Sequence, residues 1–255
     1  MRTSHSPWSI HRQAWSHLRG PLAWWFLPGS VVTLALAVLG WWGIASVSAD
    51  VSAWILERLA LDSSGTWAKT LLEWLIWALL LVVKLKLTKY IVLVVMGPLF
   101  AAVSEAAETQ ITGRVFVFSW SRWVKDAIRG MRSAILLAVF EWSLTAVLWL
   151  IGLLVPLLSP VVLPLAWLLG AWAYGASAMD YVWEREGKGA WEGLAASLRQ
   201  SMVALNVGIP FSLWMSIPLL AWTVGPLMGG MGAAATACVA LVEGAPSAED
   251  HVATT

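Results

Sequence analysis

Two glutamates, Glu105 and Glu108, follow the second apolar block of the chain and stand one helical turn apart. Residues at this spacing are neighbours on a helix surface, so the two carboxylates could share a face. Such a pair could orient a cation, carry a proton or cap a turn, whereas a carboxylate would not bind an anion directly. The alternative is a solvated helix face at the point where the block leaves the membrane.

Three lysines, Lys84, Lys86 and Lys89, interrupt the same apolar block. Charged side chains at membrane depth are costly and often functional, so Lys84 could provide a positive field for an anion. Lysines near the end of a membrane helix also snorkel to the lipid headgroups on their long stems. Both interpretations stay open at this point.

The sequence carries no motif of an enzyme. It has no Gly-x-Ser-x-Gly, no Walker loop and no HExxH. The single cysteine, Cys238, excludes an intramolecular disulfide and a cysteine-cluster metal site. None of the four histidines has the spacing of a metal ligand. We therefore expect no enzymatic activity, no metal and no cofactor.

Composition defines the class of protein. Of 255 residues, 59% are apolar and 12% are charged, and the net charge is +1. A soluble domain carries about 25% charged residues, so a soluble globular protein is excluded. The absence of a basic excess argues against a nucleic-acid partner. Long apolar blocks, without the alternation of a barrel, predict an all-α integral membrane protein whose partner is the lipid bilayer.

We expect one membrane domain over residues 1–245 and a disordered tail at 246–255. Its parts are two long transmembrane helices and two proline-centred hairpins, at residues 22–47, 67–110, 134–179 and 202–242. The second helix is longer than the ~30 Å hydrocarbon core, so it must tilt, bend near Gly97-Pro98 or protrude.

The polar stretches between these blocks predict surface segments. We expect a short amphipathic surface helix at 51–67, a basic amphipathic stretch at 114–132 and a polar segment at 180–199. In the last segment, Asp180 and Glu184 are interpreted as part of a solvated loop.

The proline clusters of the two hairpins resemble each other, since Val155-Pro156-Leu157-Leu158 matches Ile217-Pro218-Leu219-Leu220. A turn that reaches water should be polar, yet Pro156 to Pro164 offers only Ser159. We therefore expect each apex to stop inside the bilayer as a re-entrant hairpin, buried against protein. Full hairpins with short apolar turns are the alternative.

Charge placement predicts the orientation in the membrane. Basic residues crowd the N-terminus and the stretch 114–132, whereas the loop 49–66 has three acids and one arginine. By the positive-inside rule, both termini are expected on the cytoplasmic side. An inverted or dual orientation is the alternative.

The stretch from Gly97 to Glu108 resembles the Pro-Phe-Asn-x-Leu-Leu-Ala-Glu-x-x-Glu signature of the CysZ sulfate permeases, which belong to the etoposide-induced 2.4 superfamily. Pro98, Glu105 and Glu108 fall on this signature in register. Further similar segments, in family order, are Leu27-Pro28, Ile111-Thr112-Gly113, Ala178-Met179-Asp180-Tyr181 and Ile217-Pro218-Leu219-Leu220. The resemblance implies a multi-pass inner-membrane permease for sulfate or a similar small oxyanion, feeding sulfur assimilation and working as a homo-oligomer.

The resemblance places substrate binding at the turn from Ala101 to Glu105 and at basic residues before the first span. Ala101 stands where the family has glycine, and Arg19 is the base nearest to the family's arginine pair. The candidate substrate-binding residues are thus Pro98, Ala101, Ser104, Glu105, Glu108, Lys84 and Arg19. The alternative function is a non-transporting membrane protein of the same fold, acting in assembly, packing or lipid interaction.

Overall fold

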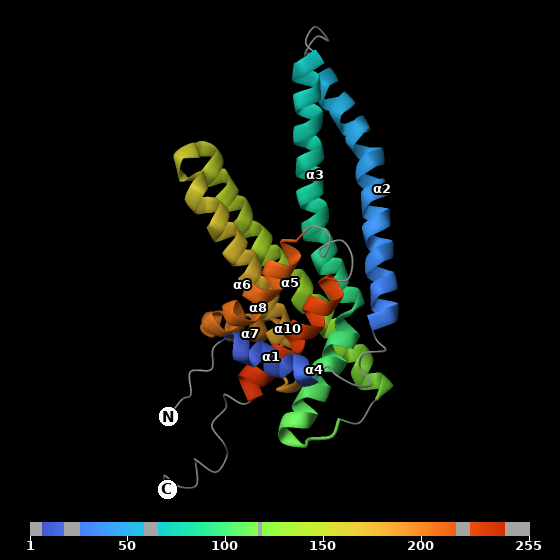
Figure 1. The fold of residues 1–255 in the computed structure, drawn as a ribbon, viewed down its shortest axis with the longest axis vertical. Coiled ribbons are helices and arrows are strands. Elements are labelled where there is room, and N and C mark those ends of the chain that lie inside the picture. The colour runs from blue at the N-terminus through green and yellow to red at the C-terminus, as the bar shows by residue number, and fades with distance from the viewer. Residues whose placement is uncertain (1–6, 18–25, 59–65, 117–118, 218–224, 243–255) are drawn as a thin grey trace.

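The structure is a computed structural model that describes residues 7–17, 26–58, 66–116, 119–217 and 225–242. All regular elements in these ranges are helices, so the predicted all-α class is confirmed. Two helical arms rise from a common base and diverge from each other (Figure 1). The elements are α1 (Pro7–His17), α2 (Phe26–Arg58), α3 (Thr66–Val95), α4 (Gly97–Thr112), α5 (Trp120–Leu154), the 3₁₀ turn η2 (Pro156–Leu158), α6 (Ser159–Arg185), α7 (Ala190–Arg199), α8 (Ser201–Met215) and α10 (Gly225–Val242).

The first arm consists of α2 and α3. The α2 helix runs on to Arg58, well past the predicted end at residue 47, and takes in the first part, 51–58, of the predicted surface helix at 51–67. The prediction of a separate surface helix was wrong, because the sequence contains neither proline nor glycine between Ile44 and Arg58 to end the first helix. The Trp41 ring of α2 packs edge-on against Trp77 of α3, with 6.0 Å between ring centroids.

The second predicted helix bends where the sequence suggested. α3 ends at Val95, and α4 begins at Gly97 with Pro98 in its first turn. Proline has no amide hydrogen to continue the α3 ladder, but its fixed φ suits the start of a new helix. The predicted bend near Gly97-Pro98 is confirmed.

The second arm is the hairpin predicted from the first proline cluster. α5 and α6 are joined by η2, which begins at Pro156, whereas Pro164 lies inside α6. Within the described residues, 124–154 and 156–185 are long and apolar enough to cross a membrane. Only 17% and 22% of their most apolar stretches are buried inside the protein. A core helix of a soluble protein would be mostly buried, so these exposed apolar surfaces are typical of a membrane protein.

Two predicted surface segments turn out to belong to this arm. α5 begins at Trp120 and therefore includes most of the basic stretch, and α6 continues to Arg185. Asp180 and Glu184 thus lie in a helix and are largely buried. The prediction of a solvated loop was wrong for them, because two acids four residues apart share one helix face and meet a partner from α5.

The base is packed around α10 and α8, the arms of the second predicted hairpin. The turn between them, at 218–224, lies outside the described residues. α8 approaches α6 so closely that a Cβ at Gly175 would lie 1.7 Å from the carbonyl oxygen of Ala204. A Cβ at Gly208 would likewise lie 1.8 Å from the carbonyl oxygen of Ala171. Only glycine permits this contact, which fixes the second hairpin against the lower half of α6.

The N-terminal helix α1 docks on the base through a buried histidine. Pro210 lies inside α8 and cannot donate to the carbonyl of Asn206, four residues earlier. His11 Nε2 lies 3.1 Å from that carbonyl oxygen, and His11 Nδ1 lies 3.0 Å from Thr236 Oγ1 of α10. A carbonyl oxygen only accepts, so Nε2 donates and satisfies the group that Pro210 leaves without a helix partner.

Candidate functional site

The helix that carries the family signature, α4, divides it between two faces. Pro98, Ala101 and Glu105 line a cavity on one side of the helix. Ser104 and Glu108 lie on the other side and are 0% and 7% exposed. Residues four apart share a helix face, so Ala101 lies with Glu105 and Ser104 lies with Glu108. Glu105 and Glu108 therefore lie in two different environments and do not act as one pair.

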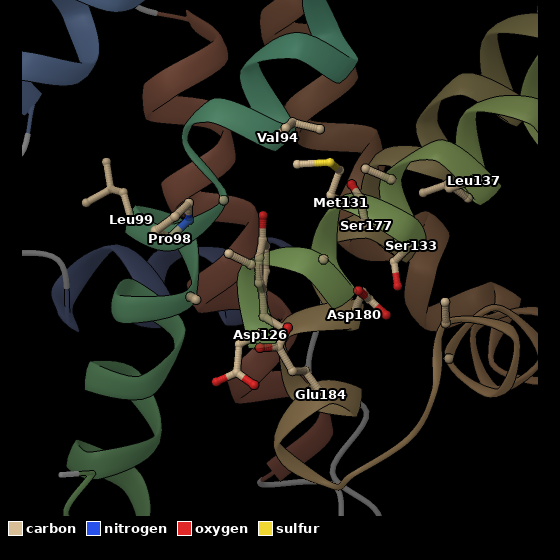
Figure 2. A pocket seen from close by; sticks show the side chains of 18 of the residues that line it. Val94, Pro98, Leu99, Asp126, Met131, Ser133, Leu137, Ser177, Asp180 and Glu184 are labelled. Atoms are coloured by element: carbon tan, nitrogen blue, oxygen red, sulfur yellow. The ribbon is translucent and has the colours of Figure 1, made fainter. Parts of the chain in front are cut away.

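The cavity has a volume of about 450 Å³ and lies between α4, α5, α6 and α7. Four acidic residues line it, and no lysine or arginine occurs among the described residues of its wall. Figure 2 shows Asp126, Asp180 and Glu184 at one end and Val94 and Met131 at the other. The described acids of the wall are Glu105, Asp126, Asp180 and Glu184.

One arginine behind this wall holds two of the acids. Arg129 donates from Nη2 to Asp180 Oδ1 at 3.0 Å and from Nη1 to Asp180 Oδ2 at 3.1 Å. The same Nη1 donates to Glu184 Oε2 at 3.1 Å, and Nε donates to the carbonyl of Lys188 at 2.8 Å. The three charged side chains are only 12–18% exposed. Two carboxylates share one guanidinium in this group, here called the acid-rich network.

The chemistry of the cavity suits water, protons or cations better than an anion. Carboxylates on the wall repel a dianion, and the strongest donors nearby, those of Arg129, are already used. Within the described residues, no group of three or more histidine, cysteine or acidic side chains could hold a metal ion. The cavity therefore gives no direct support to an anion site on the Ala101 and Glu105 face of α4.

The opposite face of α4 carries a second charged group. Arg185 Nε donates to Glu108 Oε2 at 2.6 Å, and Arg185 Nη2 donates to Ser104 Oγ at 2.9 Å. Arg114 Nη1 lies 3.5 Å from Glu108 Oε1. Here two guanidinium groups share one carboxylate, so this group, called the arginine-rich network, carries a net charge of +1. It joins the end of α6 to the signature helix.

The end of α4 brings Arg114 into this network. Gly113 has a φ of 74°, a left-handed conformation that favours glycine, and it ends the helix. The Arg114 amide then donates to Thr112 Oγ1 at 3.2 Å. The guanidinium carbons of Arg114 and Arg185 lie 5.2 Å and 5.8 Å from the centroid of the Phe116 ring. One aromatic ring therefore lies within cation–π range of both arginines.

The structure places five of the predicted site residues on α4, on two different faces of the helix. Arg19 lies outside the described residues, and Lys84 lies in α3 with a side chain that the structure does not describe. The sequence analysis did not predict that Arg129 binds Asp180 and Glu184, or that Arg185 binds Glu108. The spacing of Asp180 and Glu184 could have suggested a shared cation, but no local pattern points to Arg185.

Among the described residues, exposed apolar arms and charged groups buried at their base are typical of an integral membrane protein. The family described as Sulfate transporter CysZ/Etoposide-induced protein 2.4 matches residues 10–226. This match covers most of the chain, so the chain belongs to the CysZ/etoposide-induced protein 2.4 family. A comparison with proteins of curated function gives no match.

Proposed function

We propose that this chain is a membrane permease for sulfate or a similar small oxyanion. The observation that carries the proposal is the family match over residues 10–226, which includes the signature helix and both hairpins up to α10. The arginine-rich network on that helix supports it, because guanidinium groups are the donors that bind oxyanions most strongly. Feeding of sulfur assimilation from the inner membrane belongs to the same proposal.

The arrangement in the membrane is part of this proposal. The apex of the second arm exposes Leu153, Leu154 and Leu157, which are 76%, 71% and 88% exposed. The one hydroxyl there, Ser159 Oγ, donates to the carbonyl of Gly152 at 3.3 Å. An apex without free polar groups is stable in lipid or against another copy of the chain, so we place it inside the apolar layer of a homo-oligomer. Both termini are cytoplasmic in this arrangement.

Single-cysteine labelling tests the position of the apex. The native Cys238 is fully buried, so Leu157→Cys provides one accessible thiol, with Trp191→Cys on α7 as the exposed control. In sealed vesicles of either orientation, we expect an impermeant maleimide to label residue 191 from one side and residue 157 from neither. Labelling of residue 157 from the side opposite to residue 191 would show that the second arm spans fully.

Transport is tested with labelled sulfate in proteoliposomes of the purified chain. We expect uptake above that of empty liposomes, lowered by unlabelled sulfite as a competing oxyanion. A chloride-selective dye in the same vesicles controls for leakage. The absence of sulfate uptake by folded, inserted protein would overturn the proposal.

The second candidate is a non-transporting membrane protein of the same fold. Two observations favour it: the cavity beside Ala101 is lined by acids, and Glu108 and Ser104 bind Arg185 within the protein. In that case, the charged networks hold α4 and α6 together and have no ligand. The uptake measurement separates the two candidates, because the second predicts no flux from intact protein.

A further inference from the structure

The arginine-rich network has donors that the protein itself does not use. Arginine carries five N–H donors. Within the described residues, Arg185 uses Nε for Glu108 and Nη2 for Ser104, with Cys238 Sγ at 3.8 Å, whereas Nη1 makes no hydrogen bond. Arg114 makes one side-chain contact, at 3.5 Å, and its side chain is 62% exposed. Both oxygens of Glu108 therefore have an arginine partner, whereas Arg114 keeps N–H donors that face solvent.

We propose that Arg114 and Arg185 form an oxyanion-binding site in which Glu108 acts as an internal counter-ion that the ligand displaces. This inference rests on the proposed function and adds Arg114 and Arg185, which the family resemblance did not supply, to Glu108, which it did. The site lies on the Ser104 and Glu108 face of α4, away from the acid-lined cavity.

Charge balance supports displacement of the carboxylate. With Glu108 between them, the two arginines carry a net charge of +1. When Glu108 turns away, the pair carries +2 and matches a tetrahedral dianion such as sulfate. Each oxygen of Glu108 now faces a different arginine, so a sulfate that replaced the carboxylate could bind both guanidinium groups through different oxygens.

The surroundings assign different roles to the two arginines. Arg114 is mostly exposed and can meet an anion that arrives from water, whereas the Arg185 side chain is 10% exposed. Phe116 contacts both guanidinium groups and keeps them on one ring. Ser104, already bound to Arg185, offers a hydroxyl beside the site. An oxyanion would therefore pass from Arg114 to Arg185 as Glu108 leaves.

Removing the Glu108 carboxylate tests whether it competes with a bound anion. If the ion pair were purely structural, its removal would not tighten sulfate binding. In Glu108→Gln, the side chain keeps its shape and loses its charge. We expect it to bind sulfate at least about fivefold more tightly than the native chain, because no carboxylate competes for the arginines. Arg114→Gln and Arg185→Lys should weaken sulfate binding about tenfold or more, the loss expected for one charge-assisted contact.

The experiment is titration calorimetry with sulfate on the full chain in nanodiscs at constant ionic strength. Asp126→Asn, on the α5 wall of the acid-lined cavity, is the acid control, and Arg199→Gln, on α7, is the cation control. Both controls should bind sulfate within about twofold of the native chain. Thermal unfolding of each variant shows that it is folded, and the milder Arg185→Lys change keeps a cation beside Glu108.

The outcomes separate this site from the proposed function. If folded Glu108→Gln binds sulfate no better than the native chain, or if the native chain binds no sulfate, the site is overturned. Uptake with native affinity in Arg114→Gln also overturns it while transport stands. Binding that follows the expected order without any uptake into proteoliposomes keeps the site and overturns the permease.

Discussion

The two charged networks lie on different faces of the last turn of α6 and have opposite composition. Glu184 and Arg185 are adjacent in α6, yet Glu184 faces Arg129 of α5 and Arg185 faces Glu108 of α4. One network has two acids for one arginine, and the other has two arginines for one acid. The last turn of α6 is thereby linked to α5 by a network with more acids than arginines and to α4 by a network with more arginines than acids.

The difference concerns the donors that each network leaves available. Arg129 donates hydrogen bonds to protein groups from Nε, Nη1 and Nη2, including a bidentate contact with Asp180. Its geometry is that of a structural clamp, in which every charge has its partner inside the fold. Arg185 and Arg114 keep open donors beside a single carboxylate. Of the two, only the arginine-rich network combines positive charge, exposure and spare donors, as a binding site for an anion requires.

The largest effect on stability is expected from Arg129→Gln. This change leaves Asp180 and Glu184 buried side by side without their cation, and loss of one partner from a buried ion pair costs about 3–5 kcal/mol. We expect the free energy of unfolding in detergent to fall by this amount, measured by denaturant titration followed by circular dichroism. Sulfate binding of the remaining folded protein should not change.

A double variant serves as the control for Arg129→Gln. Asp180→Asn and Glu184→Gln together remove the two charges that Arg129 neutralises. Combined with Arg129→Gln, they should recover most of the lost stability, because no uncompensated charge remains. A triple variant as unstable as Arg129→Gln alone would show that the network contributes by packing and not by charge.

Neutralising one acid of each network should change the free energy of unfolding less than Arg129→Gln does, and by different amounts in the two networks. Glu184→Gln relieves the crowding of two carboxylates around Arg129, so stability should change little. Glu108→Gln leaves two arginines around a neutral amide and should cost about 1–2 kcal/mol, the value of a charge-assisted hydrogen bond. Added sulfate should then raise the melting temperature of Glu108→Gln more than that of Glu184→Gln, because a ligand stabilises the state that binds it. Equal shifts in both variants would remove the functional distinction between the networks.

Much of the scaffold around these networks could be predicted from local signals. Pro98 and Pro156 end helices because proline lacks an amide, and this depends only on neighbouring residues. The extension of α2 to Arg58 was missed because polar residues were interpreted as a break, although serine and aspartate on an exposed surface do not end a helix. The sequence thus predicted that these helices exist, but it predicted their ends less accurately.

The charged partners could not be predicted in the same way. Arg129 and Asp180 are 51 residues apart, and Arg185 and Glu108 are 77 apart. Which arginine meets which acid depends on the rotation of α6 between α4 and α5, and this rotation is fixed by remote contacts such as that of Gly175 with Ala204. The family signature suggested Glu108 as a site candidate, which stays a prediction, and gave no indication that this residue faces two arginines.

The smallest effect is expected where a buried titratable group is held by neutral partners only. His11 contacts the carbonyl of Asn206 and the hydroxyl of Thr236, and burial lowers the pKa of His11 below its ordinary value of 6.5. The docked helix α1 therefore binds a proton less readily than the undocked one. Docking is at full strength above pH 6.5 and weakens as the pH falls below 6.5 toward the lowered pKa.

Hydrogen exchange of the α1 amides tests this dependence. After correction for intrinsic rates, exchange in the native chain should become faster as the pH is lowered from 7.5 to 5.5. In His11→Gln, which keeps a donor for the Asn206 carbonyl, exchange should not depend on pH, whereas equal pH dependence in both proteins would show that the charged networks, and not His11, control the docking of α1.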